Sequence, residues 1–307
     1  MQYVFIVNPD AGKGNTLDTV KGLIGDREAC EICCTATKED TINLIQDRCA
    51  SGKNEDLCFV ACGGDGTVNT VATGVLTSGN AAMSILPLGS GNDYVKAYGG
   101  KDTFLNIDAL LKAEPRLVDV IRVNDRYCVN AFHFGLDSAV ANTMNLVKPK
   151  PIIGGSNAYT TGVIKALICS MRTPCTIRVD SEAFHDGNML LCTVTCGEYV
   201  GGSYRCAPRT VLDDGMAEIC LVKPVSRLRF LNLMNAYKLG NHLTDPRFEQ
   251  VVQYRRGRVI EVDGAPGFLV SLDGEVISGS HFRAEVIPRR LRFISAHEPN
   301  NGWSEGT

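Results

Sequence analysis

The chain has 307 residues, which is enough for a full hydrophobic core and for two domains. Hydrophobic residues make up 44% of it and charged residues 21%, a balance typical of a folded globular protein. The net charge of −3 excludes bulk electrostatic binding to nucleic acid, so no nucleic-acid partner is expected.

The sequence lacks the patterns of a secreted or membrane-spanning protein. Residues 1–9 have neither the basic region nor the small-residue cleavage site of a signal peptide. The most apolar helical candidate, residues 161–171, contains Lys165 and is too short to span a bilayer. The thirteen cysteines lie mostly in apolar runs such as residues 57–62, which favours buried thiols in a reducing compartment. We therefore expect a cytoplasmic protein that reaches any membrane from outside the bilayer.

The first part of the chain alternates between strand and helix patterns. Short apolar strands are predicted over residues 3–7, 57–61 and 84–87, with helices over residues 40–49 and 68–76. Strands separated by helices predict a parallel sheet with crossover connections. Residues 1–120 are therefore interpreted as an α/β domain.

From about Val118 onward, short alternating strands dominate. They are predicted over residues 119–123, 127–134, 175–179, 189–196, 217–222, 258–263 and 282–287. Turns are predicted at Asn124-Asp125, Asp186-Gly187 and Asp214-Gly215. One helix is predicted over residues 157–171, and another begins after the N-cap residue Ser226 and ends before Gly240. Residues 121–297 are interpreted as a mainly antiparallel β domain whose last strand or tail can return to the first domain.

A glycine-rich segment, Gly63-Gly64-Asp65-Gly66-Thr67-Val68-Asn69, directly follows the strand of residues 57–61. Glycine lets the backbone approach a ligand closely, and the N–H groups at the start of the next helix form an anion site. Thr67 adds a hydroxyl donor for a phosphate oxygen. The alternative is a tight strand–helix turn capped by Asp65. Two glycine pairs around one aspartate favour the phosphate site.

Two further loops leave predicted strands at the same edge of the sheet. Residues 8–14 follow the first strand, and residues 87–94 follow the strand of residues 84–87. Open α/β sheets bind ligands at this carboxyl edge. The first loop lacks the spacing of a Walker A motif, so it is weak evidence when taken alone. Three such loops together predict a nucleotide site.

Asp273-Gly274-Glu275 is the last segment whose residues are suited to catalysis or metal binding. An Asp-Gly pair is typical of a type I′ hairpin turn. Two carboxylates flanking one glycine are equally suited to supply a metal ligand and a general base. Both interpretations stay open at this point.

In this order, the segments resemble the catalytic domain of diacylglycerol kinases, specifically the bacterial soluble lipid kinases. The resemblance covers nearly the whole chain and implies an α/β nucleotide-binding domain of the NAD-kinase and diacylglycerol-kinase type, followed by an antiparallel β-sandwich domain. Its motifs lie at residues 8–13, 35–39, 63–69, 87–93, 118–120, 130–137, 212–215, 239–242, 273–275 and 286–288. The G-G-D-G-T element is shared with NAD kinases and phosphofructokinases, whereas its combination with S-x-N-D and D-G-E is more specific.

The resemblance implies transfer of the γ-phosphate of ATP, with Mg²⁺, to a lipid hydroxyl. Diacylglycerol is the expected acceptor and phosphatidic acid the expected product, although phosphatidylglycerol, a polyprenol or a long-chain base stay open. The protein would then lie at the inner face of the membrane as a peripheral protein. Two arginine clusters, at residues 255–258 and 289–292, are candidate contacts with anionic headgroups. A homodimer is a further expectation that no residue specifies.

The resemblance also assigns residues, with ATP held between the two domains. The expected nucleotide contacts are Asn8, Pro9, Ala11, Gly12, Lys13, Thr37, Gly63, Gly64, Asp65, Gly66, Thr67, Asn69, Thr70, Ser90, Asn92 and Asp93. Glu275 is expected to accept the proton of the lipid hydroxyl, with Asp273 as its alternative or as a metal partner. Lys13 and Lys96 are the cations expected near phosphate or carboxylate.

Two magnesium sites follow from the same resemblance. Asp65, Asp93 and Asp119 are expected to face the cleft, where carboxylates hold Mg²⁺. A structural Mg²⁺ is expected at Asp214, with the backbone oxygens of Val211 and Met216 beside it. For this second site a plain Asp-Gly hairpin is the alternative.

Two other functions are weighed against the lipid kinase. An NAD kinase-like enzyme with a soluble acceptor would carry an Asn-Glu pair directly before a run of nucleotide-binding residues, a signature that is not visible here, whereas the D-G-E triplet is present. A non-catalytic regulator that binds lipid or nucleotide on the same fold would have no need of Asp65, Asp273 and Glu275.

Overall fold

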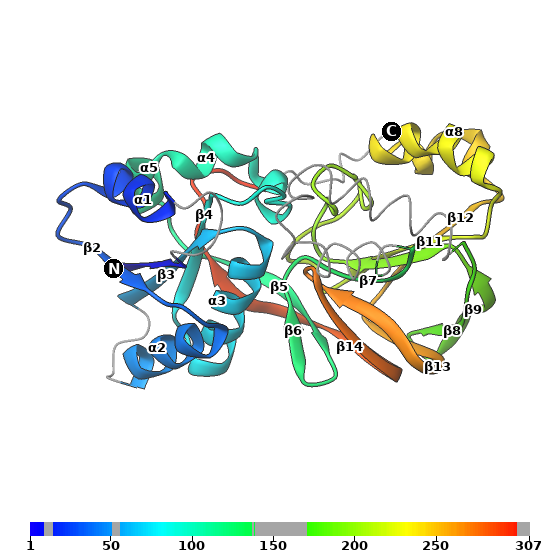
Figure 1. Cartoon of the computed structure of the whole chain (residues 1–307), viewed down its shortest axis with the longest axis horizontal. Helices are drawn as coiled ribbons and strands as arrows, with labels where there is room; N and C mark the ends of the chain where they lie inside the picture. Colours follow the sequence, from blue (N-terminus) through cyan, green and yellow to red (C-terminus); the bar gives the residue numbers. More distant parts are fainter. Residues whose placement is uncertain (9–14, 51–55, 137, 139–170, 300–307) are drawn as a thin grey trace.

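The computed structural model describes residues 1–8, 15–50, 56–136, 138 and 171–299 (Figure 1). Helices gather around the sheet in the N-terminal part, whereas strands dominate the C-terminal part (Figure 1). One path of paired strands runs through both parts, in the order β12-β11-β10-β7-β13-β14-β4-β3-β1-β2. Among the described residues, no helix is long and apolar enough to cross a membrane.

The N-terminal part is a parallel sheet covered on both faces. Its elements are β1 (Gln2–Val7), α1 (Thr16–Ile24), β2 (Cys30–Cys34), α2 (Lys38–Ala50), β3 (Leu57–Gly63), α3 (Asp65–Ser78), β4 (Ala82–Pro87), η2 (Tyr94–Tyr98), α4 (Lys101–Leu105) and α5 (Ile107–Lys112). The strands β1, β3 and β4 are buried almost throughout, as expected of parallel strands with helices on both sides. The predicted strands and helices are present here, and α1, β2, α4 and α5 are additional to them.

The C-terminal part is built from antiparallel strands around a second core. Its strands are β5 (Arg116–Val123), β6 (Arg126–Cys128), β7 (Ala131–Gly135), β8 (Thr173–Val179), β9 (Glu182–Met189), β10 (Leu191–Thr195), β11 (Ala217–Val222), β12 (Val252–Gly257), β13 (Val259–Leu272) and β14 (Glu275–Phe293). The helices are α8 (Arg227–Lys238), η3 (Asn241–Leu243) and η4 (Pro246–Phe248). Ser226 caps α8 and Gly240 follows it in the left-handed conformation, as predicted.

One sequence expectation needs correction, and another falls outside the described residues. The turn predicted at Asp186-Gly187 is wrong, because both residues lie inside β9. The hairpin turn is made instead by Asp180 and Ser181, which both have positive φ. The Asp180 carboxylate holds this turn by accepting hydrogen bonds from the N–H groups of residues 258 and 259. The helix predicted over residues 157–171 lies outside the described residues except for its last residue.

The long strand β14 belongs to both parts. It pairs antiparallel with β13 and β5, and its last residues, Arg292 and Phe293, pair parallel with β4. Phe293 is buried against Tyr94, Tyr98 and Phe104 of the first part. The chain thus returns to the first part at its end, and the division at residue 120 stays a prediction because the paired strands run on across it.

The cysteines in the described ranges are free thiols, and most of them are buried. Cys58 and Cys62 in β3 are fully enclosed, where burial raises the pKa of each thiol far above its usual range. These residues therefore act as small hydrophobic side chains, as the sequence predicts.

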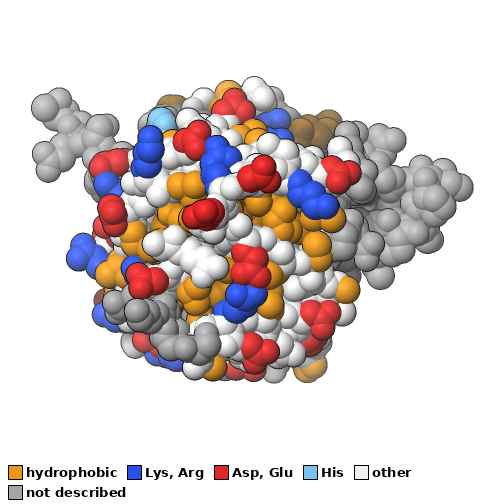
Figure 2. All heavy atoms as spheres, turned by 90° about the vertical axis from the view of Figure 1, so that its left-hand side faces the viewer, with side chains coloured by type: hydrophobic (Ala, Val, Ile, Leu, Met, Phe, Trp, Pro, Cys, Tyr) orange, Lys and Arg blue, Asp and Glu red, His pale blue; other side chains and the backbone are white. Residues whose placement is uncertain are grey.

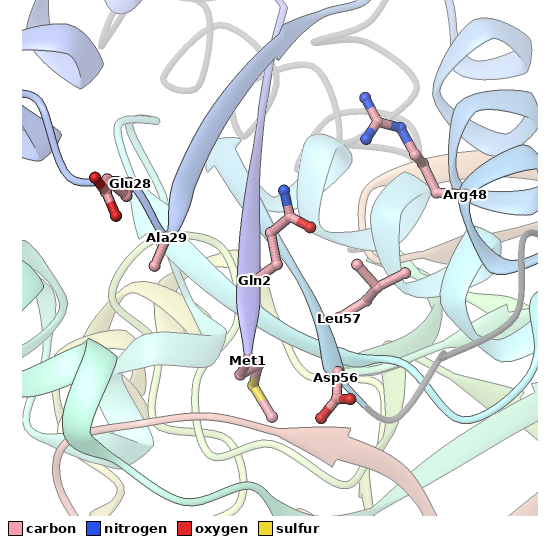
Figure 3. A pocket seen from close by; sticks show the side chains of 7 residues that line it. All are labelled: Met1, Gln2, Glu28, Ala29, Arg48, Asp56 and Leu57. Atoms are coloured by element: carbon pink, nitrogen blue, oxygen red, sulfur yellow. The ribbon is translucent and has the colours of Figure 1, made fainter.

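A broad depression of about 780 Å³ lies at the amino ends of β1 and β3. Met1, Gln2, Asp56 and Leu57 line it, together with Glu28 and Ala29 just before β2 and Arg48 of α2 (Figure 3). Figure 2 shows the surface on this side of the molecule, where acidic and basic side chains are interspersed. The depression lies at the opposite edge of the sheet from the three predicted phosphate loops, so it does not belong to the candidate site.

Candidate active site

The loops after β3 and β4 pack directly against each other. The N–H groups of Leu88 and Gly89 donate to the carbonyl oxygen of Gly63 at 3.0 and 3.1 Å. A Cβ atom added at Gly89 would lie 2.3 Å from the Cα atom of Gly64. Both loops therefore need glycine at their point of contact, and the two predicted phosphate loops form one unit.

Asp65 connects the two loops with its carboxylate. Its oxygens accept hydrogen bonds from the N–H groups of Asn92 and Asp93 at 3.0 and 2.8 Å. Burial, together with the nearby charge of Asp93, raises the pKa of Asp65 to about 6. Asn92 closes its own loop by bonding both backbone groups of Gly89.

Asp93 and Lys96 connect the first part of the chain to the second. The Asp93 carboxylate accepts from Lys96 Nζ at 2.5 Å and from the N–H group of Gly202 at 3.0 Å. Lys96 also donates to the carbonyl oxygen of Gly202 at 2.7 Å, and its ammonium lies 5.7 Å from the ring centroid of Tyr199. Lys96 thus lies beside a carboxylate, as the sequence predicts, and the loop after β10 joins the site.

Asp273 and Gly274 form the turn between β13 and β14. Both have positive φ, at 47° and 91°, and Leu272 pairs with Glu275 across the turn. Positive φ at both central residues is the signature of the type I′ hairpin. The hairpin interpretation is therefore correct for the backbone, and it places two carboxylates at the tip.

The Asp273 carboxylate is enclosed by backbone donors. The N–H groups of Val129, Asn130 and Ala131 donate to its two oxygens at distances of 2.8–3.0 Å. These bonds interrupt the strand predicted over residues 127–134, which is divided into β6 and β7 at this point. The side chain of Asp273 is only 9% exposed.

Two side chains complete the surroundings of Asp273. Asn69 in α3 donates from Nδ2 to Asp273 Oδ2 at 2.9 Å, and the Cys128 thiol donates to Oδ1 at 3.1 Å. The same Asn69 amide group donates to the carbonyl oxygen of Tyr127 at 3.0 Å. Asn69, expected as a nucleotide contact, therefore fastens the hairpin to the helix that follows the phosphate loop.

Glu275 lies at the edge of the site and is half-exposed. Its oxygens pair with Lys38 Nζ at 2.5 Å and with Arg126 Nη1 at 3.1 Å. Burial alone would raise the pKa of Glu275, but the hydrogen bonds and charges of Lys38 and Arg126 outweigh it and lower the pKa. Lys38 is the first residue of α2, so this pair is a third bridge between the two parts.

The predicted hydroxyl contacts have different surroundings. Thr37 and Asp40 form a reciprocal capping pair at the start of α2, with bonds of 3.1 and 3.0 Å. The Thr70 hydroxyl donates to the carbonyl oxygen of Gly66 inside α3. Ser90 is exposed on its loop, and Thr67 is half-exposed in the first turn of α3. The hydroxyls of Ser90 and Thr67 are therefore the more accessible ones.

Asn8 is half-buried at the end of β1, at the same edge of the sheet. The remaining predicted contacts in this loop, Pro9, Ala11, Gly12 and Lys13, lie outside the described residues. The structure thus bears on two of the three predicted phosphate loops.

Asp119 lies with the second predicted magnesium loop. Its buried carboxylate accepts from the N–H groups of Gly215 and Arg289 at 2.6 and 2.8 Å, and its own N–H group donates to Leu212. Burial raises the pKa of Asp119, and the nearby charges of Asp214 and Asp213 raise it further. The predicted metal ligands therefore form two groups, Asp65 with Asp93 and Asp119 with the loop of residues 211–216.

Asp214 has partners of its own in this loop. It pairs with Arg256 and accepts from the N–H group of Met216 at 3.1 Å. Val211 lies beside Leu212, which contacts Asp119. Among the described residues, no three His, Cys, Asp or Glu side chains are already arranged as a metal site. The mutual repulsion within each acidic group is nevertheless the electrostatic setting that a divalent cation relieves.

Several residues of the site carry no local signal in the sequence. Lys38, Arg126, Cys128, Tyr199 and Gly202 come from three separate segments, namely α2, β6 and the loop after β10, and meet only in the folded structure. Charge alone would have selected Lys38 and Arg126 together with many other surface residues. No pattern in the sequence separates them from the rest.

Family models match both parts of the chain. The diacylglycerol kinase catalytic domain matches residues 2–123. The YegS C-terminal NAD kinase beta sandwich-like domain matches residues 130–295. These matches confirm the predicted fold class, an α/β nucleotide-binding domain followed by an antiparallel β-sandwich domain.

Relatives and solved structures agree with these models. The chain is 27% identical to a probable lipid kinase YegS-like protein of Enterobacter sp. (strain 638), over 84% of this chain and 83% of the relative. It is 28% identical to a diacylglycerol kinase of Bacillus subtilis (strain 168), over 71% of this chain and 70% of the relative. A crystal structure of a candidate diacylglycerol kinase from Bacillus anthracis str. Sterne has the same fold, with a TM-score of 0.75, 24% identity and coverage of 96% and 95%.

The domain models and the names of the relatives lead to one class of enzyme. The chain therefore belongs to the family of lipid kinases in which a diacylglycerol kinase catalytic domain is followed by a YegS-type β-sandwich domain.

Proposed function

We propose that this kinase transfers the γ-phosphate of ATP, in the presence of Mg²⁺, to the hydroxyl of diacylglycerol and so forms phosphatidic acid. The observation that carries the proposal is the bond between Asn69 and Asp273. It joins the helix that starts at the phosphate loop to the hairpin that carries two carboxylates. Phosphoryl transfer depends mainly on such positioning and on charge neutralisation.

The nucleotide would lie over the paired loops of residues 63–67 and 89–93. Gly64 is the N-cap residue of α3 and provides no side-chain cap, so the first N–H groups of the helix are available to phosphate oxygens. The exposed hydroxyl of Ser90 and the half-exposed hydroxyl of Thr67 lie in the same loops. ATP use follows from membership of a kinase family, and these loops are the proposed contacts.

Asp65 and Asp93 are the proposed residues for the catalytic cation. The charge of Asp93 contributes to the raised pKa of Asp65, which means that two neighbouring carboxylates repel each other. A bound Mg²⁺ would neutralise this repulsion and the charge of the phosphates. Asp119 and the loop of Val211, Asp214 and Met216 are the proposed second site, away from the chemistry.

Glu275 is the proposed proton acceptor, and Asp273 the proposed positioning residue. Asp273 already accepts five hydrogen bonds in a buried setting, which leaves its carboxylate without capacity for a substrate hydroxyl. Glu275 pairs with two long side chains that are about half exposed, at 54% for Lys38 and 51% for Arg126. Such pairs separate at little cost, so Glu275 can turn towards an acceptor.

The test is transfer of radiolabelled phosphate from ATP to a panel of acceptors in mixed micelles. The panel contains diacylglycerol, phosphatidylglycerol, a polyprenol, a long-chain base and, as the soluble alternative, NAD. Diacylglycerol is expected to be the best acceptor. Labelling of NAD alone would support the NAD kinase-like enzyme instead, and labelling of another lipid would keep the lipid kinase but replace its acceptor.

Binding of Mg-ATP is measured separately by thermal denaturation. A ligand present at a hundredfold excess over its dissociation constant stabilises the folded state by about 2.7 kcal/mol, so a clear rise in melting temperature is expected. A protein that shows this rise but labels no acceptor would be the non-catalytic regulator. A protein without the rise would not support the proposed nucleotide site.

A further inference from the structure

We propose that helix α8 is the surface by which this enzyme docks on an anionic bilayer, with Leu228, Leu231 and Leu239 entering the interface. The inference deepens the proposed function, because an enzyme without a described membrane span must meet its lipid acceptor at the membrane surface. Figure 1 shows α8 at the outer end of the second domain. A cluster of exposed leucines with basic neighbours is what an interfacial helix requires.

Five of the six arginines in the clusters expected from the sequence to meet headgroups have partners within the protein. Arg255 pairs with Glu182 at 2.6 Å, and Arg256 pairs with Asp214 and Glu218. Arg290 and Arg292 donate to backbone carbonyl oxygens of residues 76 and 80 at 2.9 and 2.6 Å. These arginines therefore stabilise the fold, and the membrane contact is sought elsewhere.

Two exposed leucines lie on α8 and a third is its C-cap residue. Leu228 is 82% exposed, Leu231 53% and Leu239 57%. Leu233 and Ala236 are buried on the opposite face, against the sheet of the second domain. Residues spaced by three, eight and eleven positions lie on one side of a helix, so the three leucines form a single stripe, which also includes the exposed Asn232 and Asn235.

Basic side chains flank this stripe, and α8 contains no acidic residue. Arg227 and Lys238 lie on one side of the leucines and Arg229 on the other, and all three are exposed. The guanidinium of Arg229 donates to the carbonyl oxygen of residue 247 at 3.4 Å, which uses no carboxylate. Positive charge around an exposed apolar stripe is complementary to an anionic lipid surface rather than to an apolar protein groove.

The helix is also connected to the candidate active site. The carbonyl oxygen of Lys238 accepts from the N–H group of Arg205 at 3.1 Å. Arg205 lies three residues after Gly202, whose N–H group contacts the Asp93 carboxylate. One loop therefore joins the proposed docking helix to the site of phosphoryl transfer, so that docking holds the site close to the lipid.

The experiment is co-flotation of the full chain, without ATP, with vesicles of equal parts phosphatidylglycerol and phosphatidylcholine, compared with vesicles of phosphatidylcholine alone. The wild type is expected to float with the anionic vesicles, less so as salt is raised. Leu228→Ser and Leu231→Ser are each expected to weaken binding about tenfold, since each removes a side chain whose burial drives insertion. Arg227→Gln with Arg229→Gln is expected to weaken it only on anionic vesicles.

The matched control is Leu117→Ser, because Leu117 is 48% exposed on β5 and outside the proposed surface. It should bind vesicles like the wild type. As a second readout, Leu231→Trp should shift its fluorescence to the blue on mixing with anionic vesicles. Three results would overturn the proposal. The first is vesicle binding by Leu228→Ser and Leu231→Ser at the wild-type level, and the second is an equal loss of vesicle binding in Leu117→Ser. The third is a wild type that does not float with the vesicles.

Docking and chemistry are separated by a second assay with a short-chain diacylglycerol dispersed in detergent. The α8 variants should phosphorylate this acceptor at the wild-type rate and lose activity only on vesicles. If neither the wild type nor the variants phosphorylate the dispersed diacylglycerol, but the flotation results are as expected, the proposed function fails and the docking surface stands. If all phosphorylate it and the variants equal the wild type on vesicles, the docking surface fails and the function stands.

Discussion

At the scale of single residues, Asp273 and Glu275 have opposite surroundings although only one residue separates them. Asp273 is buried and accepts hydrogen bonds from three consecutive backbone N–H groups and two side chains. Glu275 is half-exposed and pairs with Lys38 and Arg126. A change at Asp273 should therefore affect folding, whereas a change at Glu275 should affect chemistry.

Asp273→Asn is expected to destabilise the protein by on the order of 2–5 kcal/mol. An amide group presents a donor where the carboxylate had an acceptor, so buried N–H groups of residues 129–131 lose their partner whichever way the amide turns. Urea denaturation measures this loss. A stability equal to that of the wild type would show that the hydrogen bonds around Asp273 do not stabilise the contact between the hairpin and residues 129–131.

Glu275→Gln is expected to lower the turnover number by about 10²–10⁴-fold while stability and ATP affinity stay at the wild-type level. Its ion pairs are exposed enough to contribute little to folding. Turnover is measured in micelles and ATP binding by thermal shift. Wild-type turnover in this variant, combined with an inactive but folded Asp273→Asn protein, would move the role of proton acceptor to Asp273.

Asp65 gives the protein a pH dependence whose sign is fixed by its raised pKa. The pKa rises from 3.8 in the unfolded chain to about 6 in the folded state, so the folded state binds this proton more tightly. The contribution of Asp65 to the free energy of unfolding is fully present below about pH 4. It is lost as the pH rises through 6, and the loss is at most about 3 kcal/mol. The wild type should lose this amount relative to Asp65→Asn between these limits.

The measurement is urea denaturation of the wild type and Asp65→Asn across this pH window. Taking the difference between the two proteins removes the contribution of every other titrating group. Asp125→Asn, at an exposed turn residue, is measured alongside as the control for removing a surface carboxylate. Parallel curves for Asp65→Asn would contradict the raised pKa.

At the scale of elements, the site depends on two loops that meet without side chains between them. The strands β3 and β4 pair in parallel register up to Gly63 and Pro87, which brings their loops out side by side. The contact between Gly64 and Gly89 then sets how the start of α3 faces the second loop. Backbone packing, rather than any side chain, therefore determines the shape of the proposed phosphate site.

Gly89→Ala should weaken ATP binding about tenfold or more and destabilise the protein by about 1–3 kcal/mol, because the new Cβ atom would lie 2.3 Å from the Cα atom of Gly64. Gly22→Ala is the matched control, since a Cβ atom there meets nothing within 4 Å and the residue lies in α1. The control should be as stable as the wild type or slightly more so. Titration of ATP and urea denaturation measure both effects.

At the scale of the whole molecule, the two domains share one strand. β14 pairs with β13 in the second domain and with β5 and β4 on its way into the first. Asp93 with Gly202, Asn69 with Asp273 and Lys38 with Glu275 add three polar bridges between the parts. The two parts should therefore unfold together.

Phe293→Ala is expected to cost about 3–5 kcal/mol in a single cooperative transition, because Phe293 is buried among Tyr94, Tyr98 and Phe104 at the end of the shared strand. Calorimetry should show one transition in the wild type and one, at lower temperature, in the variant. Phe184→Ala, at a partly buried residue outside β14, should cost less. Two separate transitions would show that the domains are independent.

The sequence by itself determined the order of the elements and the chemistry of the main loops. Apolar runs such as residues 57–61 and the glycines that follow them specify a buried strand and a tight turn into a helix through local backbone preferences, and the structure contains both. The helix after Ser226 was predicted for the same reason, since its cap and its terminating glycine are local signals. The D-G pair likewise allowed a hairpin turn at Asp273 as one of two open interpretations, and the structure contains that turn.

Only the tertiary structure decided which residues meet. The enclosure of Asp273 by residues 128–131 divides a strand that the alternating pattern made continuous, because a buried carboxylate takes the N–H groups that a sheet would have used. Asp119 contacts the loop of residues 211–216, and Lys38 pairs with Glu275, because the fold brings together segments far apart in the chain. The exposed leucines of α8 are of the same kind, since helical periodicity marks an apolar stripe but only packing decides which stripe is left uncovered.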